Sequence, residues 1–236
     1  MTLSLRAITG SALLALATSV AAFPVNLETI EGAFENPTGA IVSGEGTNSI
    51  RWGIPKYHHY QSGYDFTAYS PLPLQINDDQ PFVLGKFTHI NAPIYGDTLT
   101  GVDLNVQLGF EGGAATEGRF VFSHEETPNN ASNPFEICLF GHCFTLWDTH
   151  NGPVDDVVTF EESIISSSGF TYGGQIYSLE LIGFENGTNE FHTAEKSINS
   201  VDLLAKLNAR SVPEPGTLAL LGLGLAGLAL TRRRKI

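Results

Sequence analysis

Apolar and polar residues alternate along several segments of the chain, as in strands with one buried and one wet face. The clearest segment is residues 102–110, in which every second side chain is apolar. Turn-rich gaps with Gly, Pro and Asn separate the segments and favour chain reversals. The pattern predicts an all-β fold, a single antiparallel β-sandwich that is jelly-roll-like. Further strands are predicted at residues 82–87, 119–123, 157–160 and 176–184, and a hairpin at 137–147.

Only residues 28–34 and 201–207 invite a helical interpretation, and neither segment is strongly periodic. The apolar side chains of the second segment also fit the spacing of a strand, so we expect a final strand there. Residues 208–212 are expected to tether this domain to the C-terminal segment.

The first 22 residues have the pattern of a secretory signal peptide. Arg6 gives the basic start, residues 7–20 form a mostly apolar run, and Val20-Ala21-Ala22 supplies small residues for cleavage. A first buried helix is the alternative, but the abrupt change at Phe23-Pro24 favours export. The mature chain is expected to begin at Phe23.

The C-terminal residues contain three modules in order: Pro213-Glu214-Pro215, an apolar run over residues 218–230, and a basic cluster of Arg232, Arg233, Arg234 and Lys235. A helix over the apolar run would rise only about 20 Å, against a hydrocarbon core of about 30 Å. Such a short transmembrane span suits temporary residence in the membrane. The basic cluster should stay cytoplasmic, which leaves everything before Pro213 on the outer side.

This order of modules resembles the PEP-CTERM sorting signal of exported bacterial proteins, with Pro213, Glu214 and Pro215 matching the recognition motif. In that family an exosortase, a membrane cysteine transpeptidase, handles the signal in Gram-negative bacteria that make extracellular polysaccharide. The resemblance implies an exosortase as partner and a transient stay in the inner membrane. A single-pass anchor without processing is the alternative.

Five segments of the chain carry a second resemblance: residues 43–48, 52–53, 82–91, 126–129 and 177–184. In this order they resemble the choice-of-anchor K domain of exported bacterial proteins. The resemblance implies an extracellular all-β module without an established activity. The chain is thus expected to consist of a signal peptide (1–22), a β-sandwich domain (23–211) and a sorting signal (212–236).

The chain is acidic, with 12 Lys plus Arg against 25 Asp plus Glu and a formal charge of −13. The domain is more acidic still, because Arg6 and the basic cluster lie outside it. Such a surface repels nucleic acid, and it repels anionic polysaccharide unless divalent cations bridge the two. Nucleic-acid binding is therefore excluded. Solubility accounts for the acidity, no cofactor is assigned, and calcium is left open without a location.

Cys138 and Cys143 enclose four residues inside the predicted hairpin. Two cysteines in an exported chain are expected to form a disulfide. A zinc site that used both cysteines and His142 would still need a fourth ligand. No metal site is therefore assigned.

The seven histidines form no recognisable metalloenzyme motif. His89 is the one histidine that we single out for a test, although a structural role explains it more simply. Four pairs of neighbouring carboxylates would serve glycoside hydrolysis only if carboxylates from separate elements faced each other. These pairs are Asp78-Asp79, Glu125-Glu126, Asp155-Asp156 and Glu161-Glu162. Nucleophile-elbow and phosphate-loop motifs are missing from the sequence, so no catalytic residue is assigned.

The sequence favours a non-enzymatic, surface-displayed protein, a matrix or adhesion component of the envelope and its extracellular polysaccharide. A carbohydrate-binding module is the alternative, because aromatic rings can stack on sugars. A secreted hydrolase is the third hypothesis. The rings that the alternative would use are Trp52, Tyr57, Tyr60, Tyr64, Tyr69 and Trp147.

Overall fold

The computed structural model describes residues 21–56, 60–126, 133–139, 142–149, 155–164, 169–185, 187–212 and 224, with the backbone alone at 133–139, 142–149 and 162–164. Within the described residues up to 212, every element is a strand apart from the 3-10 turn Glu111–Gly113. The expected all-β class is confirmed. The predicted signal peptide and C-terminal transmembrane run lie outside the described residues, apart from Ala21, Ala22 and Gly224. None of the helical structure in the described part is long and apolar enough to cross a bilayer.

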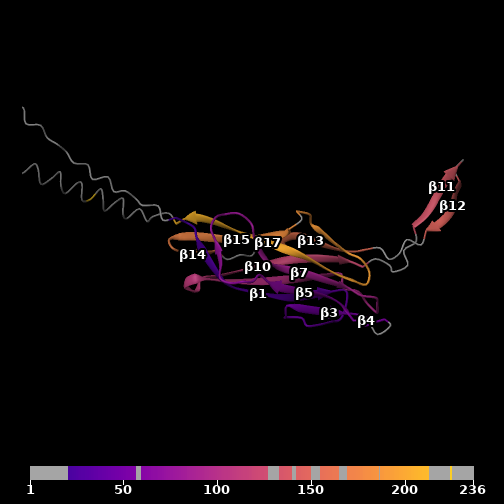
Figure 1. Cartoon of the computed structure of the whole chain (residues 1–236), viewed down its shortest axis with the longest axis horizontal. Helices are drawn as coiled ribbons and strands as arrows, with labels where there is room; N and C mark the ends of the chain where they lie inside the picture. The colour runs from indigo at the N-terminus through magenta and orange to yellow at the C-terminus, as the bar shows by residue number, and fades with distance from the viewer. Residues whose placement is uncertain are drawn as a thin grey trace, which may run out of the picture.

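Two curled antiparallel sheets make up the domain (Figure 1). The six-stranded sheet has the order β16 (Glu190–Thr193), β13 (Asp156–Ile164), β10 (Ala115–Glu125), β9 (Gly101–Phe110), β1 (Val25–Thr38) and β6 (Leu74–Ile76). The seven-stranded sheet has the order β14 (Phe170–Tyr172), β15 (Gln175–Phe184), β17 (Ser197–Ser211), β7 (Phe82–Asn91), β5 (Ser62–Ala68), β3 (Ser49–Trp52) and β2 (Val42–Ser43). Two further pairs are β4 (Ile54–Pro55) with β8 (Ile94–Tyr95), and β11 (Asn133–Leu139) with β12 (His142–Thr149).

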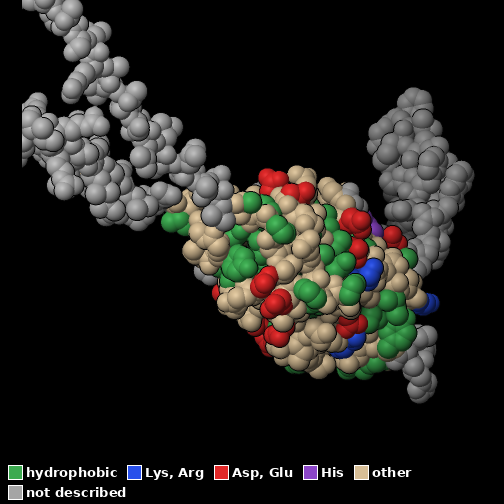
Figure 2. All heavy atoms as spheres, turned by 60° about the vertical axis from the view of Figure 1, so that its left-hand side comes forward, with side chains coloured by type: hydrophobic (Ala, Val, Ile, Leu, Met, Phe, Trp, Pro, Cys, Tyr) green, Lys and Arg blue, Asp and Glu red, His purple; other side chains and the backbone are tan. Residues whose placement is uncertain are grey.

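The buried faces of the two sheets share one apolar core. Phe87 of β7 is fully buried, and its ring centroid lies 4.8 Å from that of Tyr64 in the same sheet. The ring centroid of Phe122, from β10 in the other sheet, lies 4.9 Å from that of Phe87. Aromatic rings therefore bridge the space between the sheets. Outside this core, Figure 2 shows acidic side chains spread over the visible face, with few basic ones among them.

The segments with regular alternation form strands where the sequence predicts them. Residues 82–87, 102–110, 119–123, 157–160 and 176–184 lie within β7, β9, β10, β13 and β15. The predicted hairpin corresponds to β11 and β12, and the favoured final strand lies within β17.

Residues 28–34 belong to β1 and show why a strand can look helical in sequence. Leu27, Ile30 and Phe34 are all buried, at the spacing of one face of a helix. The pairing of β1 with β9 shifts register between Leu27 and Thr29. This irregularity changes the alternation, so that Leu27 and Ile30 both face the core.

The two described ends of the domain meet at the same end of the seven-stranded sheet. The Tyr177 hydroxyl of β15 donates a hydrogen bond to the carbonyl of Ala22, and Tyr177 pairs with Ala209 of β17. β17 continues to Ser211, which pairs with Gln175. The expected tether at residues 208–212 is thus wrong as far as Ser211, because these polar residues have ladder partners in β15. The start of the described chain and the end of β17 therefore lie at the same end of the domain (Figure 1).

Candidate functional site

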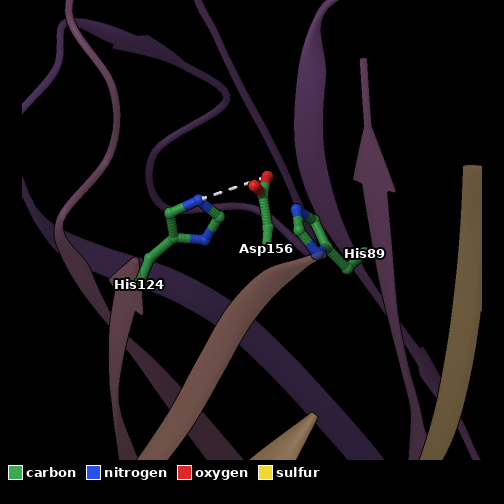
Figure 3. A group of neighbouring side chains, drawn as sticks. All are labelled: His89, His124 and Asp156. Carbon is green, nitrogen blue, oxygen red and sulfur yellow. Dashed lines mark ion pairs between the residues drawn. The ribbon is translucent and has the colours of Figure 1, made fainter. Parts of the chain in front are cut away.

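Three polar side chains meet inside the domain, between the two sheets. His89 comes from β7 of the seven-stranded sheet, whereas His124 and Asp156 come from β10 and β13 of the six-stranded sheet. Each offers one N or O atom, and these atoms all lie within 4.8 Å of one another. Figure 3 shows the carboxylate of Asp156 between the two imidazole rings. We call these three residues the His–His–Asp cluster.

Alternation along the strands brings these polar groups inside. His89 lies two residues after the core residue Phe87, and His124 lies two residues after Phe122. Asp156 lies two residues before Val158, which is also fully buried. Since side chains two positions apart share a face of a strand, all three groups occupy core positions.

His89 is the most deeply buried member, with none of its surface exposed. Neither ring nitrogen, Nδ1 or Nε2, has a hydrogen-bond partner. Burial lowers the pKa of His89 well below its usual value, and the neighbouring His124 lowers it further. The imidazole is therefore held neutral, with a free lone pair on one ring nitrogen and a proton on the other.

His124 is oriented through one nitrogen and leaves the other facing carboxylates. Its Nδ1 is hydrogen-bonded to the hydroxyl of Tyr64. Its Nε2 lies 3.6 Å from Oε2 of Glu126 and 3.9 Å from Oδ2 of Asp156. Burial raises the pKa of Tyr64 well above its usual value, and the negative charges of Asp156 and Glu126 raise it further. The phenol therefore keeps its proton.

Aromatic rings pack against the side chains of the His–His–Asp cluster. The ring of Trp52 is stacked with that of His89 at a centroid distance of 6.4 Å, and it meets His124 edge-on at 5.5 Å. Trp52 and Tyr64 are both fully buried. Asp156 is only 1% exposed, so the cluster has no open face for a substrate.

Two more buried residues near the His–His–Asp cluster, Glu195 and Asn91, add oxygen acceptors. Both carboxylate oxygens of Glu195, between β16 and β17, are buried without a hydrogen-bond partner. Burial raises the pKa of Glu195, and the charge of Glu126 raises it further. The amide of Asn91 donates to the carbonyl of Thr193 at 2.9 Å, while its own Oδ1 stays without a partner.

The sequence singled out only part of this site. His89 was expected to be worth testing, but His124 was missed, and Asp156 was considered only with its neighbour Asp155. In the structure Asp155 is exposed and Asp156 buried, as expected of neighbours that diverge. A usable signal was present, because each member is polar at a position whose alternation points to the core.

The rings proposed for sugar binding differ in how far they are exposed to solvent. Trp52 and Tyr64 are buried in the core, which removes them from any surface platform. Tyr69 packs against the core, whereas Tyr60 is 46% exposed. The remaining two, at positions 57 and 147, lie outside the residues with described side chains.

An open hollow of about 470 Å³ lies over β1, β9 and β10. Its lining includes Glu31, Glu35, Glu117 and Arg119. The amide of Asn105 donates a hydrogen bond to Glu35. The described lining contains no aromatic ring, so this hollow offers no stacking surface for a sugar.

The two cysteines lie opposite each other on neighbouring strands. In the β11–β12 pair, Cys138 has Cys143 as its cross-strand partner. Their side chains lie outside the described part of the chain, so the disulfide stays a prediction. The sorting residues Pro213, Glu214 and Pro215 and the basic cluster at residues 232–235 also lie outside the described residues, so their roles stay predictions.

Comparison with protein families identifies the C-terminal segment. A model of the PEP-CTERM protein-sorting motif matches residues 211–235. The motif implies export, processing by an exosortase, membrane anchoring at the C-terminus and then a cell-surface location. The chain matches no curated protein. The resemblance to the choice-of-anchor K domain stays a prediction.

Proposed function

We propose that this chain is a non-enzymatic component of the cell surface, sorted by an exosortase to the envelope and its extracellular polysaccharide. The sorting motif carries this proposal. It begins at residue 211, and β17 ends at Ser211. The sorting signal therefore continues directly from the last strand of the domain. A processing enzyme can engage it without unfolding the sheet.

The positions of the chain ends fit a domain delivered from the membrane. Ala22, the last residue of the proposed signal peptide, accepts a hydrogen bond from Tyr177. The backbone N–H of Val212 donates to the carbonyl of Gly174, the residue directly before β15 begins at Gln175. Signal peptide and sorting tail would thus leave the same end of the jelly-roll-like domain. The opposite end would point away from the membrane.

The non-enzymatic assignment rests on the lack of a path from solvent to the His–His–Asp cluster. The His–His–Asp cluster is the one group of potential metal-binding or catalytic side chains that the described residues gather so closely, and it is sealed inside the core. A substrate could reach it only if the sheets separated. We therefore propose a passive domain of the choice-of-anchor K type, in which the described residues form no substrate-processing site.

Deleting residues 213–236 tests the sorting role. The full chain should sediment with the envelope fraction, whereas the truncated chain should be released into the periplasm or the medium. A matched variant replaces Pro213, Glu214 and Pro215 with alanine and keeps the apolar run and the basic cluster. It should stay in the membrane as an unprocessed form of higher mass. Equally firm retention of the truncated chain in the envelope would overturn the proposal.

A further inference from the structure

We propose that the His–His–Asp cluster is a structural binding site for one transition-metal ion of the Zn²⁺ class, with Glu126 as a fourth ligand. The site does not depend on the sorting role. It uses His89, His124 and Asp156 from three strands, together with the residue that directly follows β10.

The spacing of the ligand atoms fits such an ion. Zinc bonds to imidazole nitrogen and carboxylate oxygen are about 2.0–2.2 Å long, which puts tetrahedral ligand atoms about 3.4 Å apart. In the cluster the offered atoms lie within 4.8 Å of one another. His124 Nε2 and Glu126 Oε2 are already at 3.6 Å. Binding would draw the offered atoms of His89, His124 and Asp156 closer together than the 4.8 Å within which they lie now.

Buried polar atoms without hydrogen-bond partners give an energetic reason for a cation to bind at this site. Both nitrogens of His89, Nε2 of His124 and Oε2 of Glu126 are buried without hydrogen-bond partners. A buried polar group whose hydrogen bond is unmade destabilises the fold, because it has lost its contact with water and gained no partner. One divalent cation bound to one nitrogen of His89, to Nε2 of His124 and to Oε2 of Glu126 would satisfy a lone pair on each of these three side chains.

The donor set selects the class of metal. Imidazole nitrogens suit zinc and similar transition-metal ions, whereas calcium and magnesium take oxygen ligands. Tyr64 supplies the support that such sites use, because its bond to Nδ1 of His124 leaves Nε2 aimed at the ion. In this arrangement Nδ1–H donates to the phenol oxygen.

The ion would act as a brace. It would join β7 of one sheet to β10 and β13 of the other. In sequence, the ligands from β10 and β13 flank residues 127–154, which contain the β11–β12 hairpin. His89 pairs with Asn199 near the start of β17, while the sorting tail follows Ser211 at its end. At about 3.3 Å per residue the two points are roughly 40 Å apart along the strand. The brace would hold the end of the domain opposite the tail.

Metal titration of the full chain tests the site. The protein, extracted in detergent and purified through an affinity tag without histidine, is stripped with a chelator and titrated with ZnCl₂. We expect one equivalent to bind and the melting temperature to rise by several degrees, with no such rise in excess CaCl₂. His89→Gln and Asp156→Asn should each weaken zinc binding at least a hundredfold.

The control variants separate this site from other ligands. His192 of β16 is about half exposed, with its Nε2 3.4 Å from Glu190, so His192→Gln should keep full zinc affinity. The double variant Cys138→Ser, Cys143→Ser should keep it as well. Loss of binding in either control, at the level of Asp156→Asn, would overturn the assignment.

Cobalt provides a readout that does not depend on whether the variants fold. Co²⁺ bound to the stripped wild-type chain should give the intense visible absorption of a four-coordinate N/O site. Zinc should then displace it in a one-to-one ratio. Weak absorption typical of six-coordinate hydrated cobalt, or no retained zinc after dialysis of the wild-type chain, would refute the proposal.

Discussion

At the scale of single residues, two glycines make room for one aromatic ring of the core. A Cβ atom on Gly32 of β1 would overlap the ring of Phe66, and one on Gly85 of β7 would lie 2.7 Å from it. Gly32→Ala should therefore lower the free energy of unfolding by about 1–3 kcal/mol through overpacking. Urea unfolding should show that the same substitution costs much less in a Phe66→Leu background. Equal costs in both backgrounds would contradict this packing.

The positions of single residues also explain why the sequence predicted the His–His–Asp cluster only in part. The predicted strand at residues 119–123 stopped one residue before His124, so the inward position of this histidine was not counted. Asp156 opens β13, and its partner across the ladder is Thr193 of β16, a strand that the sequence did not suggest. Polar residues at strand ends look like turn residues. The alternation with Phe122 and Val158 would indicate that they face the core only once the strands are extended to include them.

At the scale of elements, the β11–β12 hairpin places the two cysteines where a disulfide between them is expected. Because Cys138 and Cys143 are cross-strand partners, a disulfide would close a short loop and restrict the unfolded hairpin by roughly 2 kcal/mol. Peptide mapping without reduction should recover the two cysteines in one cross-linked peptide. Reduction should speed hydrogen exchange at residues 133–149 and leave the rest of the domain unchanged. Alkylation of both thiols without prior reduction would exclude the bridge.

At the scale of the whole molecule, the folded domain ends where the sorting motif begins. A chain that ends at Val212 should be as stable to urea as one that carries the tail. A chain that ends at Leu207 loses the pairing of residues 208–211 with β15, including the 2.8 Å hydrogen bond from Asn208 to Glu180. At about 1 kcal/mol per hydrogen bond, it should lose roughly 2–4 kcal/mol of stability. Equal stability of the two truncated chains would restore the tether interpretation.

The sequence by itself determined the strands with regular alternation, the all-β class and the sorting signal at the C-terminus. These features are local, because alternation and the order of Pro213-Glu214-Pro215, apolar run and basic cluster can be read from neighbouring residues. Tertiary structure decided the rest. The bulge in β1, the full length of β17 and the meeting of His89, His124 and Asp156 depend on register and on the packing of two sheets. Such contacts join residues far apart in the chain, so no local pattern specifies them.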